Sequence, residues 1–190
     1  MDTVLDVVEI WLRTRSGTLS IRRMVRYPRR PSPVKQVNPF CEIRRSPIHG
    51  RGVFASRRIR RGSRIIEYLG ERIDKEESNR RGLALFEEAQ KTGGASVYIF
   101  DLNNQWDLDG NKPYNDARLI NHSCDPNSEM VNEDDRLFLF ALRDILPGEE
   151  ITFDYGYDIE HFLDHPCRCG APGCVGYIVS RSQWPLLKRK

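Results

Sequence analysis

The sequence of 190 residues predicts a mostly β domain of short strands with little helix. Short runs rich in apolar, β-branched and aromatic residues recur between turn signals made of glycine, proline and asparagine. In the body of the chain only one segment has helical spacing. Near the C-terminus, three of the five cysteines stand within eight residues, which is typical of a metal-bound segment.

The strands are expected in the middle of the chain. The strand-like runs, in order, are residues 52–55, 64–69, 97–102, 105–108, 136–142 and 151–155. Asn103-Asn104, between the third and fourth runs, is a hairpin signal. Residues 74–91 predict a helix because apolar positions are spaced among charges, and Gly93-Gly94 ends it.

A short pattern occurs twice between these strands. Ile59-x-x-Gly62-x-x-Ile65 and Ile145-x-x-Gly148-x-x-Ile151 share one spacing, and each predicts a turn that leads into a strand. The pattern is too short to indicate a repeat protein.

The N-terminal part differs in composition from the rest. Residues 3–12 place apolar side chains at helical spacing, which predicts a short amphipathic helix; an extension without fixed structure is the equal alternative. Residues 13–37 are basic and interrupted by proline, as in a mobile linker. Residues 1–37 are therefore predicted to be a basic, partly flexible extension.

The net charge of +3 hides an uneven distribution. Residues 1–37 hold eight Lys/Arg and three Asp/Glu, and residues 176–190 hold four basic residues and no acid. These two segments, the basic ends, carry +5 and +4, whereas residues 38–175, with 18 basic and 24 acidic residues, carry −6. An acidic body attracts Lys/Arg-rich partners, so a basic protein or peptide is the expected partner.

Composition also excludes some classes of protein. No run of about 18 apolar residues exists, so a membrane-spanning helix and a membrane partner are not expected. Five cysteines are not the even, spread set of a secreted disulfide framework. The N-terminal apolar stretch precedes the arginines and contains acids, unlike a signal peptide. Reduced cysteines and an intracellular protein are therefore predicted.

Cys167, Cys169 and Cys174 form a C-x-C-x4-C pattern, with glycines and a proline that let the backbone wrap around an ion. Three thiolates leave a structural zinc one ligand short of a tetrahedron. Spacing alone does not decide the fourth ligand, for which the candidates are Cys124, Cys41, His122, His161 and His165.

Three polar clusters are each weak when taken alone. Gly50-Arg51-Gly52 lacks the third glycine of a dinucleotide fingerprint. Residues 121–123, Asn-His-Ser, are compatible with a turn that contains a satisfied histidine. Residues 151–157 are compatible with a plain strand that has one buried face.

In this order, however, the clusters resemble the SET-domain protein-lysine methyltransferases, over roughly residues 40–179. The matching pieces are Gly50-Arg51-Gly52-Val53, Glu67-Tyr68-Leu69-Gly70-Glu71, and residues 98–102, 117–124 and 150–156. The final cysteine run, followed by Gly176-Tyr177-Ile178, resembles the post-SET zinc segment. Two positions depart from the family pattern: Leu119 stands where Phe is usual, and Tyr114 where Gly is usual.

The resemblance implies a fold of small twisted sheets with a pseudoknot near the Asn-His motif, short helices and a zinc-bound C-terminal segment. It places the SET catalytic domain at residues 38–160, and the post-SET segment with its basic tail at 161–190. It implies binding of S-adenosylmethionine, catalytic roles for Tyr155 and Tyr98, and one structural zinc with Cys124 as its fourth ligand. The residues implied to hold S-adenosylmethionine are Gly50, Arg51, Gly52, Tyr98, Asn121, His122 and Tyr155. The residues implied to line the lysine channel are Phe153, Tyr157, Tyr177 and Ile178.

The resemblance also implies what the protein acts on. Its substrate would be a lysine in a histone or a histone-like basic protein, which suggests nuclear or chromatin location in a eukaryotic setting. Phe153, rather than Tyr, implies addition of two or three methyl groups. A catalytically silent module that binds basic peptides or chromatin is the alternative, and the chain is expected to be monomeric.

Nucleic-acid contact through the basic ends is a third interpretation. Residues 13–35 have charge but only one aromatic residue, which favours a solvated linker. Five further arginines, at positions 57, 58, 60, 61 and 64, surround the first copy of the duplicated pattern. A solvated face is the simpler interpretation of these arginines, with contact to nucleosomal DNA as the alternative.

Overall fold

The computed structural model describes residues 10–13, 19–22, 38–92 and 98–187, and the chain divides into two units, Met1–Pro33 and Val34–Lys190. In the first unit, β1 (Ile10–Arg13) pairs antiparallel with β2 (Leu19–Arg22). The expected helix over 3–12 is therefore wrong at residues 10–12, and residues 3–9 lie outside the described part. A helix of this length is marginal without tertiary contacts, whereas a hairpin satisfies main-chain groups of both strands. The linker expected over 13–37 likewise contains strand β2.

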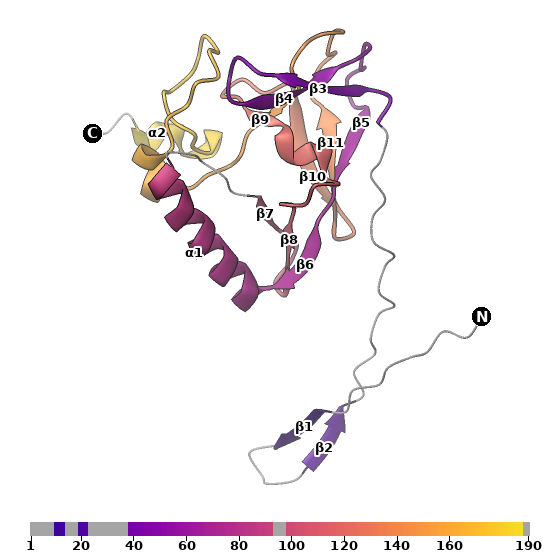
Figure 1. Ribbon diagram of the computed structural model, residues 1–190, viewed down its shortest axis with the longest axis vertical. Helices are drawn as coiled ribbons and strands as arrows, with labels where there is room; N and C mark the ends of the chain where they lie inside the picture. Colours follow the sequence, from indigo (N-terminus) through magenta and orange to yellow (C-terminus); the bar gives the residue numbers. More distant parts are fainter. Residues whose placement is uncertain (1–9, 14–18, 23–37, 93–97, 188–190) are drawn as a thin grey trace, which may run out of the picture. The chain divides into compact units, whose positions relative to one another are not determined.

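The described residues of the second unit form four small sheets, as expected, together with a few helices (Figure 1). One three-stranded antiparallel sheet contains β10 (Ser128–Glu133), β11 (Arg136–Ala141) and β5 (Arg64–Tyr68) in that order. The other contains β6 (Glu71–Asp74), β8 (Trp106–Asp109) and β7 (Ile99–Asp101). The remaining two are an antiparallel pair, β3 (Cys41–Arg45) with β4 (Arg51–Ala55), and a parallel pair, β9 (Asn121–His122) with β12 (Thr152–Phe153).

The described residues contain few helices, and the bounds expected for the long helix, 74–91, are each within one residue of those observed. Helix α1 spans Lys75–Thr92 and follows β6 directly, as Figure 1 shows, and α2 (Trp184–Leu187) is a single turn. The 3₁₀ helices are η1 (Asp116–Leu119), η2 (Ile159–Asp164) and η3 (Arg181–Gln183). None of the helices in the described residues is long and apolar enough to cross a membrane.

The expected hairpin at Asn103-Asn104 is confirmed as the β7–β8 pair, with a longer turn than two residues. The Asn103 side-chain oxygen accepts the N–H groups of Gln105 and Trp106 at 2.9 and 3.0 Å, which closes the turn. Strands β3, β6 and β10 were not expected. Each carries charged or polar residues at exposed positions, so none forms a continuous apolar run.

The duplicated pattern forms two equivalent turns, the first turn (residues 56–64) and the second turn (residues 142–150). Ile59 and Ile145, both buried, exchange two main-chain hydrogen bonds of 2.9 Å. The N–H of Gly62 donates to Ala141 O at 2.8 Å, and the N–H of Gly148 donates to Ala55 O at 2.7 Å. Both glycines have positive φ, 75° and 83°, which explains their place in the pattern. The two turns therefore brace one another reciprocally.

The hydrophobic core lies where these turns and the sheets meet. Its buried members from β4, β5, β11 and the turns include Val53, Ile65, Leu139, Ile145 and Ile151. Phe153, 4% exposed, belongs to the same core. The core thus extends directly to the residues that the sequence assigns to function.

Candidate functional site

Residues 49–52, the glycine turn, lead into β4 and lie against Asn121. The Asn121 side-chain nitrogen donates to Arg51 O at 3.2 Å, His49 O at 3.3 Å and Glu150 Oε1 at 2.7 Å. A Cβ at position 52 would lie 2.1 Å from Glu150 Oε1, so any side chain there would displace the carboxylate that holds Asn121. A Cβ at Gly50, whose φ is +49°, would meet nothing within 4 Å. The main chain of this turn therefore faces open space that a ligand can approach.

The parallel contact of β9 with β12 brings two distant motifs together. Asn121 lies opposite Thr152, and His122 lies opposite Phe153. This is the kind of neighbour contact that the expected pseudoknot requires, and it sets the Asn-His motif beside the tyrosine motif. Ser123 N–H extends the contact by donating to Phe153 O at 3.2 Å.

His122 links the tyrosine motif to the cysteine cluster. The ring is 3% exposed, its Nδ1 accepts the N–H of Tyr155 at 3.2 Å, and its Nε2 lies 3.6 Å from Cys124 Sγ. Burial lowers the pKa of His122, partly opposed by Asp154, so the ring is neutral at physiological pH. Since Nδ1 is an acceptor, the proton sits on Nε2 and faces the sulfur.

Tyr155 keeps its proton. Its hydroxyl donates to Ile120 O at 2.9 Å, and burial, with smaller contributions from Tyr157 and Tyr98, raises its pKa above the usual value near 10. A phenol in this state can donate a hydrogen bond and orient a polar group, but it is a poor general base at neutral pH.

Aromatic rings surround Tyr155 in series. Its ring centroid lies 5.0 Å from that of Phe153 and 5.6 Å from that of Tyr157, and Phe153 lies 6.0 Å from Phe100. Tyr68 packs on Phe100 at 4.7 Å and donates its hydroxyl to Tyr98 O at 3.0 Å. The rings of Tyr68, Phe100, Phe153, Tyr155 and Tyr157 thus form one continuous series of aromatic contacts.

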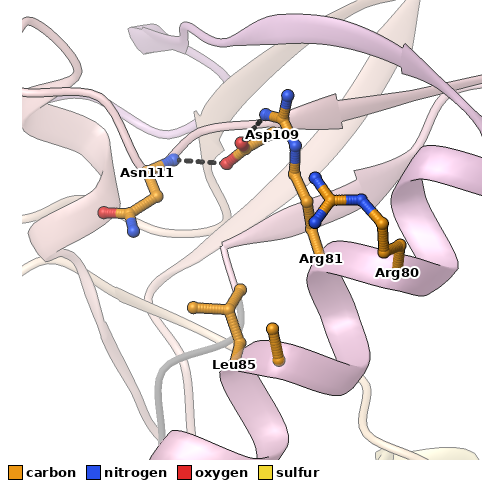
Figure 2. Close-up of a pocket in the computed structure, with 6 residues that line it drawn as sticks. Arg80, Arg81, Leu85, Asp109 and Asn111 are labelled. Atoms are coloured by element: carbon orange, nitrogen blue, oxygen red, sulfur yellow. Dashed lines mark hydrogen bonds and ion pairs between the residues drawn. The ribbon is translucent and has the colours of Figure 1, made fainter.

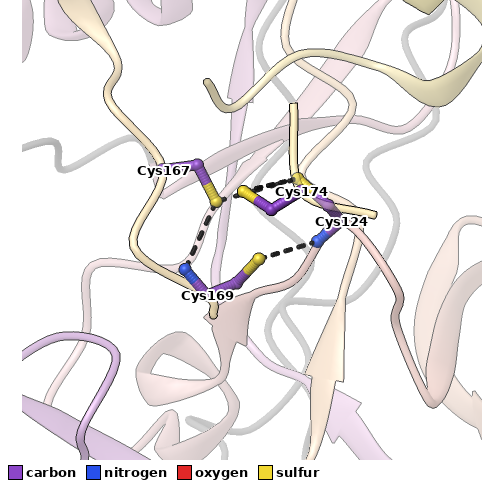
Figure 3. Close-up of side chains that lie close together, drawn as sticks. All are labelled: Cys124, Cys167, Cys169 and Cys174. Atoms are coloured by element: carbon purple, nitrogen blue, oxygen red, sulfur yellow. Dashed lines mark hydrogen bonds between the residues drawn. The ribbon is translucent and has the colours of Figure 1, made fainter. Parts of the chain in front are cut away.

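The four cysteines come together as a compact cluster (Figure 3). The sulfurs of Cys124, Cys167, Cys169 and Cys174 all lie within 4.8 Å of one another. Cys124 Sγ is 3.7 Å from the sulfurs of both Cys167 and Cys174. Zn–S bonds of about 2.3 Å place the sulfurs of a regular tetrahedron about 3.8 Å apart, so the cluster fits a zinc ion.

The surroundings of the cluster also suit a cation. Burial raises the pKa of Cys124 to about 12, so this thiol needs a metal to ionise. Burial opposes ionisation of Cys169 as well, yet the main-chain N–H groups of Cys124 and Ala171 lower its pKa to about 7. Cys41 belongs to β3 and is not part of the cluster; burial, then Asp116, raises its pKa to about 12.

Of the other candidates for the fourth ligand, His122 lies next to the cluster, while His165 points elsewhere. The His165 ring packs against Tyr157 at 4.8 Å. The side chain of His161 lies outside the described residues. The geometry therefore agrees with the ligand set that the family resemblance implies.

The C-terminal segment is fastened to the tyrosine motif at several points. Asp154 accepts the N–H of Arg181 at 3.1 Å, and Tyr157 O accepts the N–H of Ser180 at 2.8 Å. Ile178 N–H donates to His165 O at 2.8 Å, and the Tyr177 ring packs on Phe162 at 4.8 Å. Among the described residues, no hydrogen bond or ring contact joins Tyr177 or Ile178 to Tyr155, so their place in the channel stays a prediction.

Sequence reasoning missed several residues that hold the site. Glu150 anchors both Asn121 and Ser46 Oγ, the latter at 2.9 Å. Tyr68 fills the space above Gly110, where a Cβ would lie 2.1 Å from its ring. Both residues stood within motifs that carried the family resemblance, but a carboxylate and a strand tyrosine give no local sign of what they contact.

A pocket of about 240 Å³ lies between α1 and the end of β8 (Figure 2). Its lining includes Arg80, Arg81, Leu85, Asp109 and Asn111. Arg81 pairs with Asp109, Glu71 and Glu77, so its charge is already matched. None of the site residues predicted from the sequence lines this pocket.

Comparison with known proteins finds matches to a single family. A SET domain family model matches residues 50–156. The chain is 39% identical over 160 residues, 82% of its length, to the variant-silencing SET domain-containing protein of Plasmodium falciparum. It is 35% identical over 175 residues, 88% of its length, to the H3 lysine-4-specific histone-lysine N-methyltransferase of Aspergillus oryzae.

The protein of the same description in Saccharomyces cerevisiae is 39% identical over 142 residues, 70% of the chain. All three relatives are far longer than this chain. The match spans only 6% of the Plasmodium protein and 13% of each of the two fungal proteins.

The cluster geometry predicts one zinc ion per chain, measured by elemental mass spectrometry on purified protein. Cys124→Ser and Cys174→Ser should each lower the zinc content well below one, because serine is a poor zinc ligand. Cys41→Ser should retain one zinc and serves as the matched control. Full zinc in the Cys124→Ser variant would contradict the four-cysteine assignment.

Replacing His122 should destabilise the protein. His122→Phe keeps the ring but leaves the buried N–H of Tyr155 without its acceptor, which should lower the free energy of unfolding by about 1–3 kcal/mol. His122→Asn keeps an acceptor close to the position of Nδ1 and should lose less. Urea denaturation of the three proteins checks this order, and equal stability of wild type and His122→Phe would refute it.

Proposed function

The chain belongs to the SET-domain family, and we propose that it is a protein-lysine methyltransferase that uses S-adenosylmethionine. The observation that carries the proposal is the parallel contact of β9 with β12, which sets Asn121 and His122 beside Phe153 and Tyr155. The match of the SET domain model to residues 50–156 covers both motifs.

The residues around the glycine turn are suited to hold the methyl donor. Gly50 is exposed and has no side chain to block the approach of a ligand to the main chain beside Asn121. S-adenosylmethionine supplies a methyl group on a cationic sulfur. The chain's own contribution is therefore alignment and exclusion of water, not generation of a strong nucleophile.

The lysine must lose its proton before it can accept a methyl group. A lysine with a pKa near 10.4 costs about 4.6 kcal/mol to deprotonate at pH 7. Desolvation by the rings of Phe153, Tyr155 and Tyr157 would lower this cost, as would a nearby cationic sulfur. Protonated Tyr155 acts in this scheme as the group that orients the amine.

The zinc cluster would hold the C-terminal segment over the site. Cys124 follows His122 by two residues, and the other three ligands belong to the segment that is fastened to Asp154 and Tyr157. Zinc binding contributes on the order of 10 kcal/mol in small zinc peptides, which is ample to order such a segment. Removal of zinc would then abolish methyl transfer.

A histone is the proposed substrate. Several relatives are named as histone-lysine methyltransferases, and the acidic body of this chain would attract a basic tail. Location at chromatin follows from that substrate. A catalytically silent module that binds basic peptides remains the rival, and a methyl-transfer assay separates the two.

Tyr155→Phe should slow methyl transfer on the order of a hundredfold or more, because the orienting hydroxyl is lost. Binding of S-adenosylmethionine, measured by calorimetry, should change little. The assay is radiolabelled methyl transfer to a histone H3 peptide. A near-normal rate in the variant would refute the role of Tyr155, and no transfer by the wild type to any histone would favour the silent module.

The number of methyl groups should depend on position 153. We propose that the wild type adds two or three, since Phe153 leaves space beside Tyr155 and cannot hold a water or the amine by a hydrogen bond. Phe153→Tyr should shift the product to monomethyl-lysine, as read by mass spectrometry of the peptide. Monomethyl product alone from the wild type would contradict this assignment.

A further inference from the structure

The first turn carries an unusual concentration of arginine. Arg57, Arg58, Arg60 and Arg61 are all exposed, and the turn that joins β4 to β5 contains no acidic residue. Ile59 is buried and lies between the two pairs of arginines, so it fixes the turn on the core while the arginines stay at the surface.

The second turn shows that the fold does not need these arginines. The two turns share the same buried isoleucine, the same positive-φ glycine and reciprocal main-chain hydrogen bonds. Where the first turn has Arg58, Arg60 and Arg61, the second turn has Asp144, Leu146 and Pro147. The same backbone therefore forms without positive charge at these positions, so Arg60 and Arg61, which make no ion pair among the described residues, are not needed to shape the turn.

Nearby acids neutralise little of this charge. Arg58 pairs with Asp144, which also accepts the N–H of Arg61 at 2.8 Å. The guanidinium of Arg57 lies 4.0 Å from the centroid of the Phe40 ring and has no carboxylate partner among the described ion pairs. Arg60 and Arg61 likewise have no ion-pair partner in the part of the chain that the structure describes.

The acids of the second turn are occupied elsewhere. Glu149 pairs with Arg143, and Glu150 accepts from Asn121 and Ser46. Among the described residues, Arg57, Arg60 and Arg61 thus have no ion-pair partner of their own, and Asp144, already paired with Arg58, offsets only part of the charge of Arg60. Arginine in this state is suited to bind phosphate, because its planar fork contacts phosphate oxygens in pairs.

We propose that the first turn binds the phosphate backbone of double-stranded DNA. This partner rests on the proposed function, because a histone substrate is normally wrapped by DNA. Duplex is favoured over single strands because Phe40, the aromatic ring beside the arginines, packs against the core and is covered by Arg57, which makes it unsuited to stack on bases. The contact would be independent of base sequence, since it involves phosphates only.

The test is binding of the full chain to a short mixed-sequence DNA duplex over a range of salt concentrations. The Arg60→Ala/Arg61→Ala double variant should bind at least about tenfold more weakly at 0.1 M salt, and its salt slope should fall by about 2, near 0.9 for each phosphate contact. The Arg60→Lys/Arg61→Lys variant keeps both charges and should retain most of the slope.

The matched control is Arg72→Ala/Arg80→Ala, which removes two exposed arginines from β6 and α1 and should leave the slope unchanged. The basic ends are present in every protein compared, so their contribution cancels. Equal slopes for Arg60→Ala/Arg61→Ala and the control would overturn the proposal. The proposal would also be overturned if Arg60→Ala/Arg61→Ala bound the duplex as well as wild type does but lost binding to anionic vesicles or to single-stranded RNA.

Failure of this proposal differs from failure of the proposed function. Methylation of a free histone H3 peptide should be the same in the wild type and in Arg60→Ala/Arg61→Ala, while methylation of nucleosomes should fall. If the wild type showed no methyl transfer but Arg60→Ala/Arg61→Ala still bound the duplex more weakly, the enzyme assignment would be contradicted and DNA binding would be supported. If Arg60→Ala/Arg61→Ala methylated nucleosomes at the wild-type rate and bound the duplex as well as wild type does, only the DNA-binding proposal would be contradicted.

Discussion

The two-residue parallel contact between β9 and β12 is the constraint on which the rest of the site depends. It joins residues that are 31 positions apart in the sequence and is too short to be stable by itself, with only two residue pairs in register. Buried polar groups on each side complete it. Asn127 receives the N–H of Thr152 at 2.9 Å and donates to Glu150 O at 2.7 Å, and Ser128 Oγ donates to Thr152 O at 2.8 Å. These groups are fully buried, so loss of any partner would leave a costly unsatisfied atom.

The contact also explains why a metal cluster and a tyrosine belong to one site. Cys124 leaves β9 two residues after His122, and Tyr155 leaves β12 two residues after Phe153, so the ring of His122 spans the space between them. The C-terminal segment has little apolar burial, with Val179, 1% exposed, as its one fully buried hydrophobic residue among those described. Four clustered sulfurs and a few main-chain hydrogen bonds take the place of a core there, and a metal ion held by the sulfurs would add the stability that the segment lacks.

The sequence was informative about local structure and about chemistry, and less so about contacts across the chain. Helix α1 and the β7–β8 hairpin follow from spacing and turn residues, which act locally. The expected strand over 151–155 is only Thr152–Phe153, because Asp154 turns to accept N–H groups from Gly156 and Arg181. The contacts of Glu150 and Asn127 could not be predicted from local sequence, since their partners lie at least 22 residues away. The choice of Cys124 came from family resemblance, and distances between sulfurs now support it independently.

The two equivalent turns have the same backbone but carry side chains with different roles. Arg64 and Glu150 occupy equivalent positions, each one residue before the last isoleucine of its pattern. Arg64 lies at the surface, over the Phe138 ring and paired with Glu133, whereas Glu150 turns inward to hold Asn121 and the glycine turn. Because the two turns brace each other through Ile59 and Ile145, a change that loosens one should loosen the other. The inward carboxylate of the site and the outward arginines of the surface therefore depend on the same pair of isoleucines.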